Sequence, residues 1–148
     1  MENNKVLAQQ FGVLKQVMAL NASDVSQDDS LISSPSNGNS VNWLVGHMIA
    51  VRDVIIKILG GEPLADEKTH SLYDRGKTNV TKENAMNINE LLEIYYKGSD
   101  EIISRLSEKE LTEEKDIETI ATLSFHESYH AGQIGLFRRI MGKEPKIK

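Results

Sequence analysis

Residues 118–141 read ETIATLSFHESYHAGQIGLFRRIM, and this stretch decides the fold class. Large apolar side chains and histidines recur along it every three or four residues, which is the period of a helix with one buried face. The buried stripe consists of Leu123, His126, His130, Ile134 and Phe137. Gly142 follows the stretch, and a glycine at this position commonly ends a helix. The sequence therefore predicts a long helix over 118–141 with two histidines on its buried face.

Three further segments show the same helical period. They span residues 4–20, 41–59 and 88–106. Ser40 is a suitable N-cap for the second segment and Gly60 a suitable end, while Asn87 and Glu90 have the spacing of a capping box for the third. No segment alternates apolar and polar residues as a half-buried strand does. The economical architecture is an all-α bundle in a single domain, residues 1–148.

Two long polar connections separate these segments. ASDVSQDDSLISSPSNGN covers residues 22–39 and GEPLADEKTHSLYDRGKTNVTKENAM covers residues 61–86. Both exceed the usual length of a loop between helices, which indicates either a functional role or a crossover between distant ends of a bundle. His70 lies in the second connection without periodic context, so we expect it to be exposed. Whether its loop covers a site is left open.

Composition narrows the classes of protein and of site. The 148 residues are 39% hydrophobic and 26% charged, as in ordinary globular domains, and no apolar run approaches the length of a membrane span. The first residues lack the basic and apolar regions of a secretion signal, so we expect a cytoplasmic protein. Cysteine is absent, so a metal ion would need His, Asp or Glu ligands. The net charge of −5 and the scattered basic residues argue against nucleic acid as a partner.

Three histidines lie on apolar stripes, and they are the main functional signal. His126 and His130 are four residues apart, so their Cβ atoms are about 6 Å apart on one helix face. His47 lies on the predicted stripe of residues 41–59, which consists of Trp43, His47, Ala50, Val51, Val54 and Ile58. A single buried histidine is commonly bonded to a backbone carbonyl, and a metal-free bundle would have all three bonded in this way. Three imidazoles pointing into one bundle favour a site for a divalent cation, with His47, His126 and His130 as ligands.

Residues 126–130 also match H-E-x-x-H, the signature of zinc peptidases. The downstream Gly and His that one large class of these enzymes requires are replaced by Gln133 and Leu136. Glu144, the remaining acidic candidate, lies beyond the predicted helix end. We therefore interpret the string as a coincidence, and expect Glu127 to be a surface acid beside the seam or a hydrogen-bond partner of a ligand imidazole.

Several neighbouring residues receive structural interpretations. Gln133 is expected to bond an imidazole or the backbone, or to lie at the rim of the bundle, and Gly132 to let another helix approach closely. Arg138 fits the helix dipole and can pair with an acid across the bundle. Arg52 and Asp53 are expected on a solvated face.

The segments NWLVGHMIAVRD (42–53) and HESYHAGQIGLFRRIMG (126–142) resemble the DinB/YfiT-like family of small bacterial proteins. The resemblance extends over nearly the whole chain. It implies a four-helix bundle of up-down-down-up topology and a three-histidine site for Zn²⁺ or Ni²⁺, carried here by His47, His126 and His130. It also implies a homodimer.

The same resemblance implies an activity. Characterised members of the family include S-transferases that use the thiol bacillithiol and a mycothiol-dependent maleylpyruvate isomerase. The expectation for this chain is a metal-dependent transferase of the thiol S-transferase type, acting on a small molecule with a low-molecular-weight thiol such as bacillithiol. The alternatives are a non-catalytic metal-binding or stress-response bundle and a metal-dependent hydrolase. The residues themselves do not identify the thiol, the acceptor or the native metal.

Overall fold

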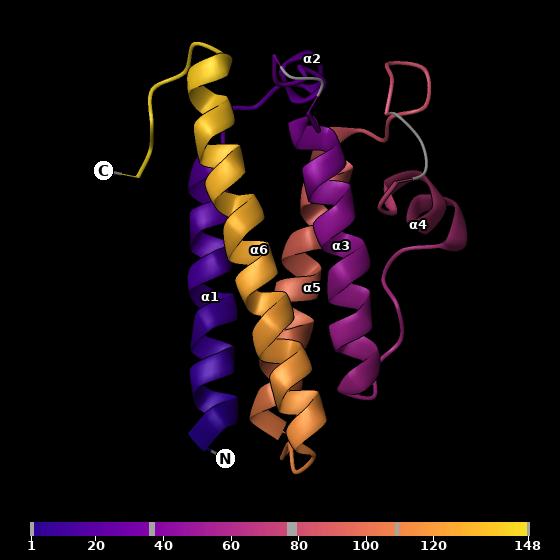
Figure 1. Cartoon of the computed structure of the whole chain (residues 1–148), viewed down its shortest axis with the longest axis vertical. Coiled ribbons are helices and arrows are strands. Elements are labelled where there is room, and N and C mark those ends of the chain that lie inside the picture. The colour runs from indigo at the N-terminus through magenta and orange to yellow at the C-terminus, as the bar shows by residue number, and fades with distance from the viewer. Residues whose placement is uncertain (1, 36–37, 77–79, 109, 148) are drawn as a thin grey trace.

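The structure is a computed structural model that describes residues 2–35, 38–76, 80–108 and 110–147. Within these ranges the chain forms six helices and no β-strand (Figure 1). They are α1 (Glu2–Ala22), α2 (Gln27–Ser30), α3 (Val41–Ile58), α4 (Glu67–Tyr73), α5 (Ile88–Glu108) and α6 (Glu114–Ile140). The all-α class predicted from the sequence is confirmed.

The four long helices lie side by side. Each of α1 and α3 packs against both α5 and α6. Helices α1 and α6 run in one direction, and α3 and α5 run in the other (Figure 1). Side-chain bonds agree with these directions, because Asn21 near the end of α1 bonds the carbonyl of Ala131 in the second half of α6, and Asn4 bonds the carbonyl of Leu106 at the end of α5. Since α3 and α5 are parallel, the chain between them must return along the bundle, which accounts for the long connection.

The helix ends follow local chemistry. The Ser40 hydroxyl accepts a hydrogen bond from the backbone N–H of Trp43 (3.3 Å), so the predicted N-cap of α3 is confirmed. Gly60 and Gly142 have φ of 80° and 72°, the left-handed conformation that ends a helix. Helix α6 begins at Glu114, four residues before the predicted start. The prediction began near the first apolar residues, whereas the real first turn is acidic and is favoured by the helix dipole.

Two short helices were not predicted. Helix α2 is capped by Ser26, and α4 is capped by Asp66, whose carboxylate accepts from the N–H of Thr69 (2.8 Å). Both caps are polar residues within polar connections, where the apolar period of a helix is absent. Helix α4 packs only on α3 among the long helices, on the outer side of the bundle (Figure 1).

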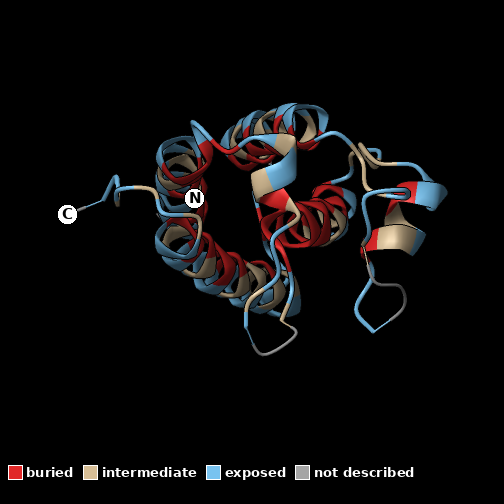
Figure 2. Ribbon diagram, turned by 90° about the horizontal axis from the view of Figure 1, so that it is seen from above, coloured by how far each residue is buried: buried red, intermediate tan, exposed pale blue. Residues whose placement is uncertain are grey.

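The core lies between the four long helices, whose inward faces are buried (Figure 2). Helix α3 is buried on more than one side, because it contacts α4 as well as α5 and α6. The predicted stripe of α3 was therefore wrong in part: Val54 is 47% exposed, while Ile55 and Ile56 are fully buried. Within the residues described, no helix has both the length and the apolarity that crossing a membrane requires.

Candidate metal centre

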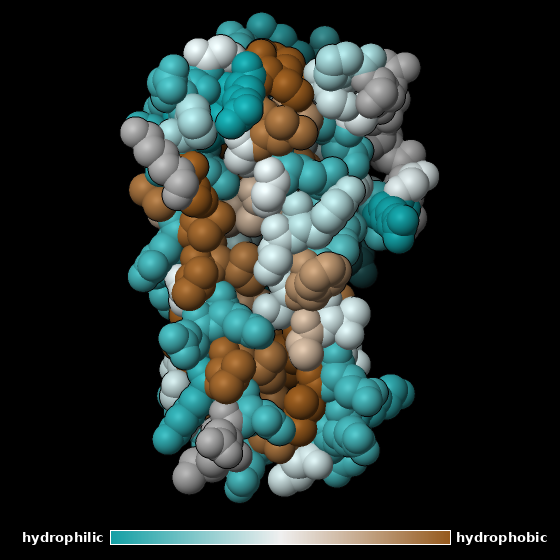
Figure 3. Space-filling model, turned by 60° about the vertical axis from the view of Figure 1, so that its left-hand side comes forward, coloured by the Kyte–Doolittle hydropathy of each residue, from teal (hydrophilic) through white to brown (hydrophobic). Residues whose placement is uncertain are grey.

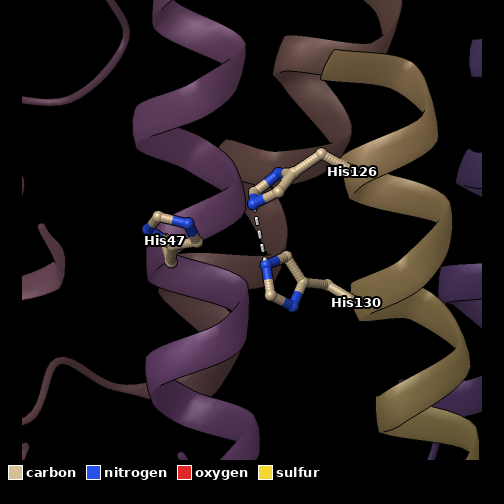
Figure 4. A group of neighbouring side chains, drawn as sticks. All are labelled: His47, His126 and His130. Carbon is tan, nitrogen blue, oxygen red and sulfur yellow. Dashed lines mark hydrogen bonds between the residues drawn. The ribbon is translucent and has the colours of Figure 1, made fainter. Parts of the chain in front are cut away.

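Three histidine side chains converge between α3 and α6 (Figure 4). His126 and His130 project from adjacent turns of α6, and His47 projects from α3 towards them. The ring centroids of His126 and His130 are 4.4 Å apart, and that of His47 lies 5.2 Å and 5.4 Å from theirs. One nitrogen of each ring lies within 4.8 Å of the other two. The three residues predicted as ligands are thus brought together.

In two of the three rings, a hydrogen bond determines which nitrogen keeps its lone pair for a metal ion. The Nδ1 atom of His47 donates to the carbonyl oxygen of Tyr73 (3.2 Å), and the Nδ1 atom of His130 donates to the amide oxygen of Gln133 (2.6 Å). A neutral imidazole carries one proton, so Nε2 of each ring keeps a lone pair. Partners of this kind are typical of metal-binding histidines, whose tautomer and orientation they set.

His126 completes the cluster. Its Nε2 atom lies 3.0 Å from Nε2 of His130. Without an ion, His126 must donate here, because the His130 nitrogen is an acceptor. The Nδ1 atom of His126 is then left buried, with no hydrogen-bond partner in the part of the chain that the structure describes. A ring with one unsatisfied nitrogen is costly in a protein interior.

The donor set fits a divalent cation. Three neutral imidazoles are common ligands of zinc and other transition metals, and Nε2 is the free nitrogen in two of them. Ligands bound at 2.0–2.1 Å can be up to about 4.2 Å apart, so the 3.0 Å between His126 and His130 is compatible with one shared ion. The residues identify no particular metal.

The surroundings of His126 and His47 favour the neutral form of these two rings. Burial, and then the nearby His130 and His47, lower the pKa of His126 to about 4. Burial is also the main cause that lowers the pKa of His47. Metal ions bind the neutral form of imidazole, so near neutral pH no proton has to be removed from either ring before an ion binds.

Residues from α3 and α4 hold His47 in place. The indole of Trp43 stacks on the His47 ring, with centroids 4.6 Å apart and planes at 12°. Tyr73, at the end of α4, packs its ring against Gly46, where a Cβ atom would lie 2.3 Å from the ring. The Tyr73 hydroxyl donates to Asn42 (2.8 Å). Helix α4 therefore supplies the carbonyl that sets the tautomer of His47. The sequence signal for this short helix is its capping residue, Asp66.

A buried ion pair lies beside the histidines. The guanidinium of Arg52 donates to both carboxylate oxygens of Glu127 (2.7 and 3.0 Å), to the carbonyl of Tyr95 (2.6 Å) and to the Ser99 hydroxyl. The Tyr95 hydroxyl also donates to Glu127 (3.3 Å), and the guanidinium carbon lies 3.6 Å from the centroid of the Tyr95 ring. This network joins α3, α5 and α6.

The predictions for Arg52 and Glu127 were wrong. Arg52 is not on a solvated face, and Glu127 is neither a surface acid nor bonded to a ligand imidazole. With its oxygens bound to Arg52 and Tyr95, Glu127 is not placed to activate water as in a peptidase. A sequence signal existed, because Arg52 follows Ile49 by three residues and precedes Ile56 by four, on a second buried face of α3.

Asp53 was also predicted on a solvated face, and it too is buried. Its carboxylate accepts from the backbone N–H groups of Leu64 (2.8 Å) and Ala65 (3.0 Å) and from Nε2 of His70 (2.8 Å). His70 is half-buried rather than exposed, and it takes no part in the three-histidine cluster. These bonds tie the end of the α3–α4 connection, and α4 itself, to α3.

The predictions for three other residues near the histidines had different outcomes. Gln133 bonds the imidazole of His130, which is one of the roles expected for it. Arg138 pairs with Asp24 across the bundle, as one of its interpretations allowed. Gly132 does not accommodate a helix, because a Cβ atom built there would meet nothing within 4 Å.

Comparisons with protein-family models, with curated proteins and with solved structures found no match to this chain.

Proposed function

We propose that this chain is a divalent-metal-binding helical bundle of the DinB/YfiT-like kind, and that it works as a metal-dependent transferase of the thiol S-transferase type. The observation that carries the proposal is the convergence of His47, His126 and His130, with Nε2 of His47 and His130 held as acceptors. The opposite directions of the α1–α6 and α3–α5 pairs (Figure 1) support the up-down-down-up topology that the resemblance implies.

The ligand set explains what an ion would contribute. A dication held only by neutral nitrogens keeps its full charge, and it can stabilise the thiolate of a low-molecular-weight thiol such as bacillithiol. In an S-transfer of this type, the thiolate would form a bond to an electrophilic carbon of the acceptor while the leaving group on that carbon departs with its electron pair. The thiol proton would pass to solvent beforehand, so an ion that lowers the pKa of the thiol would raise the amount of the attacking form.

The chain's own residues prepare this site. Gln133 and the Tyr73 carbonyl orient two rings, and Trp43 packs on a face of His47. His126 is the least buried of the three histidines, so its side of the cluster is the side open to a substrate. Glu127 is neutralised by Arg52 and adds no negative charge to the cluster.

A second candidate function is a non-catalytic metal-binding bundle, in which the ion mainly stiffens the core. It is favoured by the burial of two of the three histidines, His47 and His130, which restricts access to the cluster. The two functions differ in whether a thiol or an inhibitor anion reaches the ion.

Elemental analysis of the purified protein tests the site. We expect about one equivalent of a transition metal, and its loss in His126→Ala. His70→Ala is the matched control, because this histidine lies outside the cluster, and it should keep the metal. Full occupancy in His126→Ala would contradict the proposed ligands.

A screen of thiols against electrophilic acceptors then tests the activity. A rate that depends on both the thiol and the metal, and that is lost in His126→Ala but kept in His70→Ala, supports the transferase. A metal-loaded protein whose Co²⁺ spectrum is unchanged by every thiol would favour the non-catalytic bundle.

A further inference from the structure

The side of the bundle where α1 meets α6 carries a groove that the metal centre does not use. Its volume is about 890 Å³, and none of the three clustered histidines lines it. Binding sites for small molecules have volumes of roughly 300–1,000 Å³. Figure 3 shows this side of the molecule, with apolar groups spaced along the long axis between hydrophilic ones.

The groove is elongated and mainly apolar. On α1 it extends from Val6 to Asn21, a length of about 22 Å at a rise of about 1.5 Å per residue. Val6, Val13, Phe125 and Leu136 line it, and each of them is more than half exposed. Small lining residues on α6 leave space beside that helix. Since about 890 Å³ is spread over this length, the groove fits a linear chain better than a bulky ring system.

The charges of the groove differ from those of the whole chain. The chain has 22 acidic residues and 17 basic ones, but no Asp or Glu is among the described residues that line the groove. The charged residues that line it are Arg139 and Lys146, at the end where α1 and α6 finish. Within the described ranges neither of them forms an ion pair, because the nearby carboxylate of Asp24 is held by Arg138. One end of an apolar groove thus offers two cations without a partner anion.

The helix dipoles oppose this charge but are weaker than it. The C-terminal end of a helix carries a partial negative charge of about half a unit, and its effect falls off within the last turn. Two such ends are together smaller than the two full charges of Arg139 and Lys146. This end of the groove therefore favours an anionic group.

We propose that the groove binds one free long-chain carboxylate of the fatty-acid type. Its carboxylate lies beside Arg139 and Lys146, and its hydrocarbon chain runs along α1 towards Val6. The apolar side chains cover the methylene groups, and the two cations receive the charge. The site is separate from the metal centre, so the inference does not depend on the function proposed for that centre.

A partner helix or a lipid surface fits this space less well. A helix with its side chains is about 10–12 Å across, so a length of about 22 Å occupies roughly twice the volume of the groove. A flat lipid surface reaches the exposed rim but not Ser124 and Ala131, which line the groove and are buried. A single extended chain is narrow enough to lie against both.

Calorimetric titration of the full-length protein tests the proposal, with octanoate, decanoate and dodecanoate below the concentrations at which they form micelles. We expect one molecule per chain. The affinity should rise about tenfold or more from octanoate to dodecanoate, because each added methylene is partly removed from water. Circular dichroism at the same concentrations checks that the protein remains helical.

Filling the groove should abolish binding. A Cβ atom at Gly132, which lines the groove, meets nothing within 4 Å, so the side chain of Gly132→Leu has room and occupies the space of the ligand. We expect the affinity for dodecanoate to fall at least tenfold. Gly12→Leu is the matched control, because a Cβ atom there also meets nothing within 4 Å, but Gly12 does not line the groove. Leucine favours a helix more than glycine does, so both variants should fold.

Removing the cations tests the position of the carboxylate. Arg139→Gln with Lys146→Gln should weaken the binding of decanoate about tenfold, because two charge interactions are lost. The binding of 1-decanol, which has the same chain length and no charge, should be unchanged. Lys57→Gln is the control, an exposed lysine in the last turn of α3 that does not line the groove. It should leave both affinities unchanged.

Four results would overturn the proposal. The first is that no carboxylate of the series binds. The second is that Gly132→Leu binds dodecanoate as tightly as Gly12→Leu does. The third is that the loss of the two cations weakens decanoate and 1-decanol equally. The fourth is another occupant: light scattering shows a dimer that Gly132→Leu separates, or the protein sediments with phosphatidylglycerol vesicles, while free dodecanoate does not bind.

Discussion

Two arginine–carboxylate pairs hold α6 to the rest of the molecule, and they differ in the exposure of the carboxylate. Arg52 and Glu127 join α3 to the middle of α6, and both side chains are buried. Arg138 and Asp24 join the end of α6 to the residues that follow α1, and there the arginine is equally buried but the carboxylate is 46% exposed. The two guanidinium groups are alike, so the difference lies in the access of water to their partners.

That difference separates two structural roles. Arg52 and Glu127 each depend on the other for charge compensation, in a region where water does not replace a lost partner. Arg138 also donates to the carbonyls of Asn21 and Glu144, and water reaches Asp24. The inner pair therefore fixes how the helices that carry the histidines meet, whereas the outer pair fastens one end of the bundle.

Neutralising the inner carboxylate should have the largest effect. Glu127→Gln keeps the shape of the side chain but leaves the Arg52 cation buried without an anion. We expect the free energy of unfolding to fall by about 3–5 kcal/mol, measured by urea denaturation of the metal-free protein. A loss below about 1 kcal/mol would show that neutral acceptors, namely the Tyr95 carbonyl, the Ser99 hydroxyl and the new amide oxygen, are enough to compensate the guanidinium.

Replacing both members of the inner pair should separate stability from metal binding. In Arg52→Met with Glu127→Met no charge remains buried, so stability should recover to near that of the wild type. The affinity for Zn²⁺ should still fall about tenfold or more, because His126 loses the anchored neighbour that positions its turn of α6. A competitive titration with a coloured chelator measures the dissociation constant. An unchanged value would mean that apolar packing suffices to position the histidines.

The histidine cluster and the outer ion pair should lose their contributions to stability in different pH ranges. Burial lowers the pKa of His126 from 6.5 in the unfolded chain to about 4, so the unfolded state takes up the proton first as the pH falls. The metal-free protein should therefore lose stability between about pH 6.5 and pH 4. In the outer pair, the hydrogen bond from Arg138 lowers the pKa of Asp24 from 3.8. The contribution of this pair to stability is therefore lost only below about pH 3.8. The urea midpoint, measured from pH 6.5 to pH 4 for the wild type and for His126→Asn, tests the contribution of His126. If the midpoint falls equally steeply with pH in the variant, the loss of stability comes from other groups.

The sequence predicted what depends on local spacing. The four long helices follow from the apolar period. His126 and His130 lie close together because residues four apart share one face of a helix. The burial of Arg52 and Asp53 could not be predicted in the same way, because it depends on partners far along the chain or on backbone groups. Arg52 needs Glu127, which lies 75 residues away, and Asp53 needs the N–H groups of Leu64 and Ala65. A charged side chain is solvated by default, and only tertiary contacts reverse this.

Neutralising the outer carboxylate should have the smallest effect, and it is the matched control for Glu127→Gln. Asp24→Asn removes the anion from Arg138, but the guanidinium keeps two carbonyl partners and water can reach the vacated side. We expect a loss of about 1 kcal/mol or less in the same urea experiment, and no change in the affinity for Zn²⁺. A loss as large as that of Glu127→Gln would show that the buried guanidinium, rather than the exposure of its partner, sets the energy of both pairs. Since the two variants make the same chemical change, one on α6 and one on the segment that follows α1, the ratio of their effects measures how much burial of the carboxylate contributes.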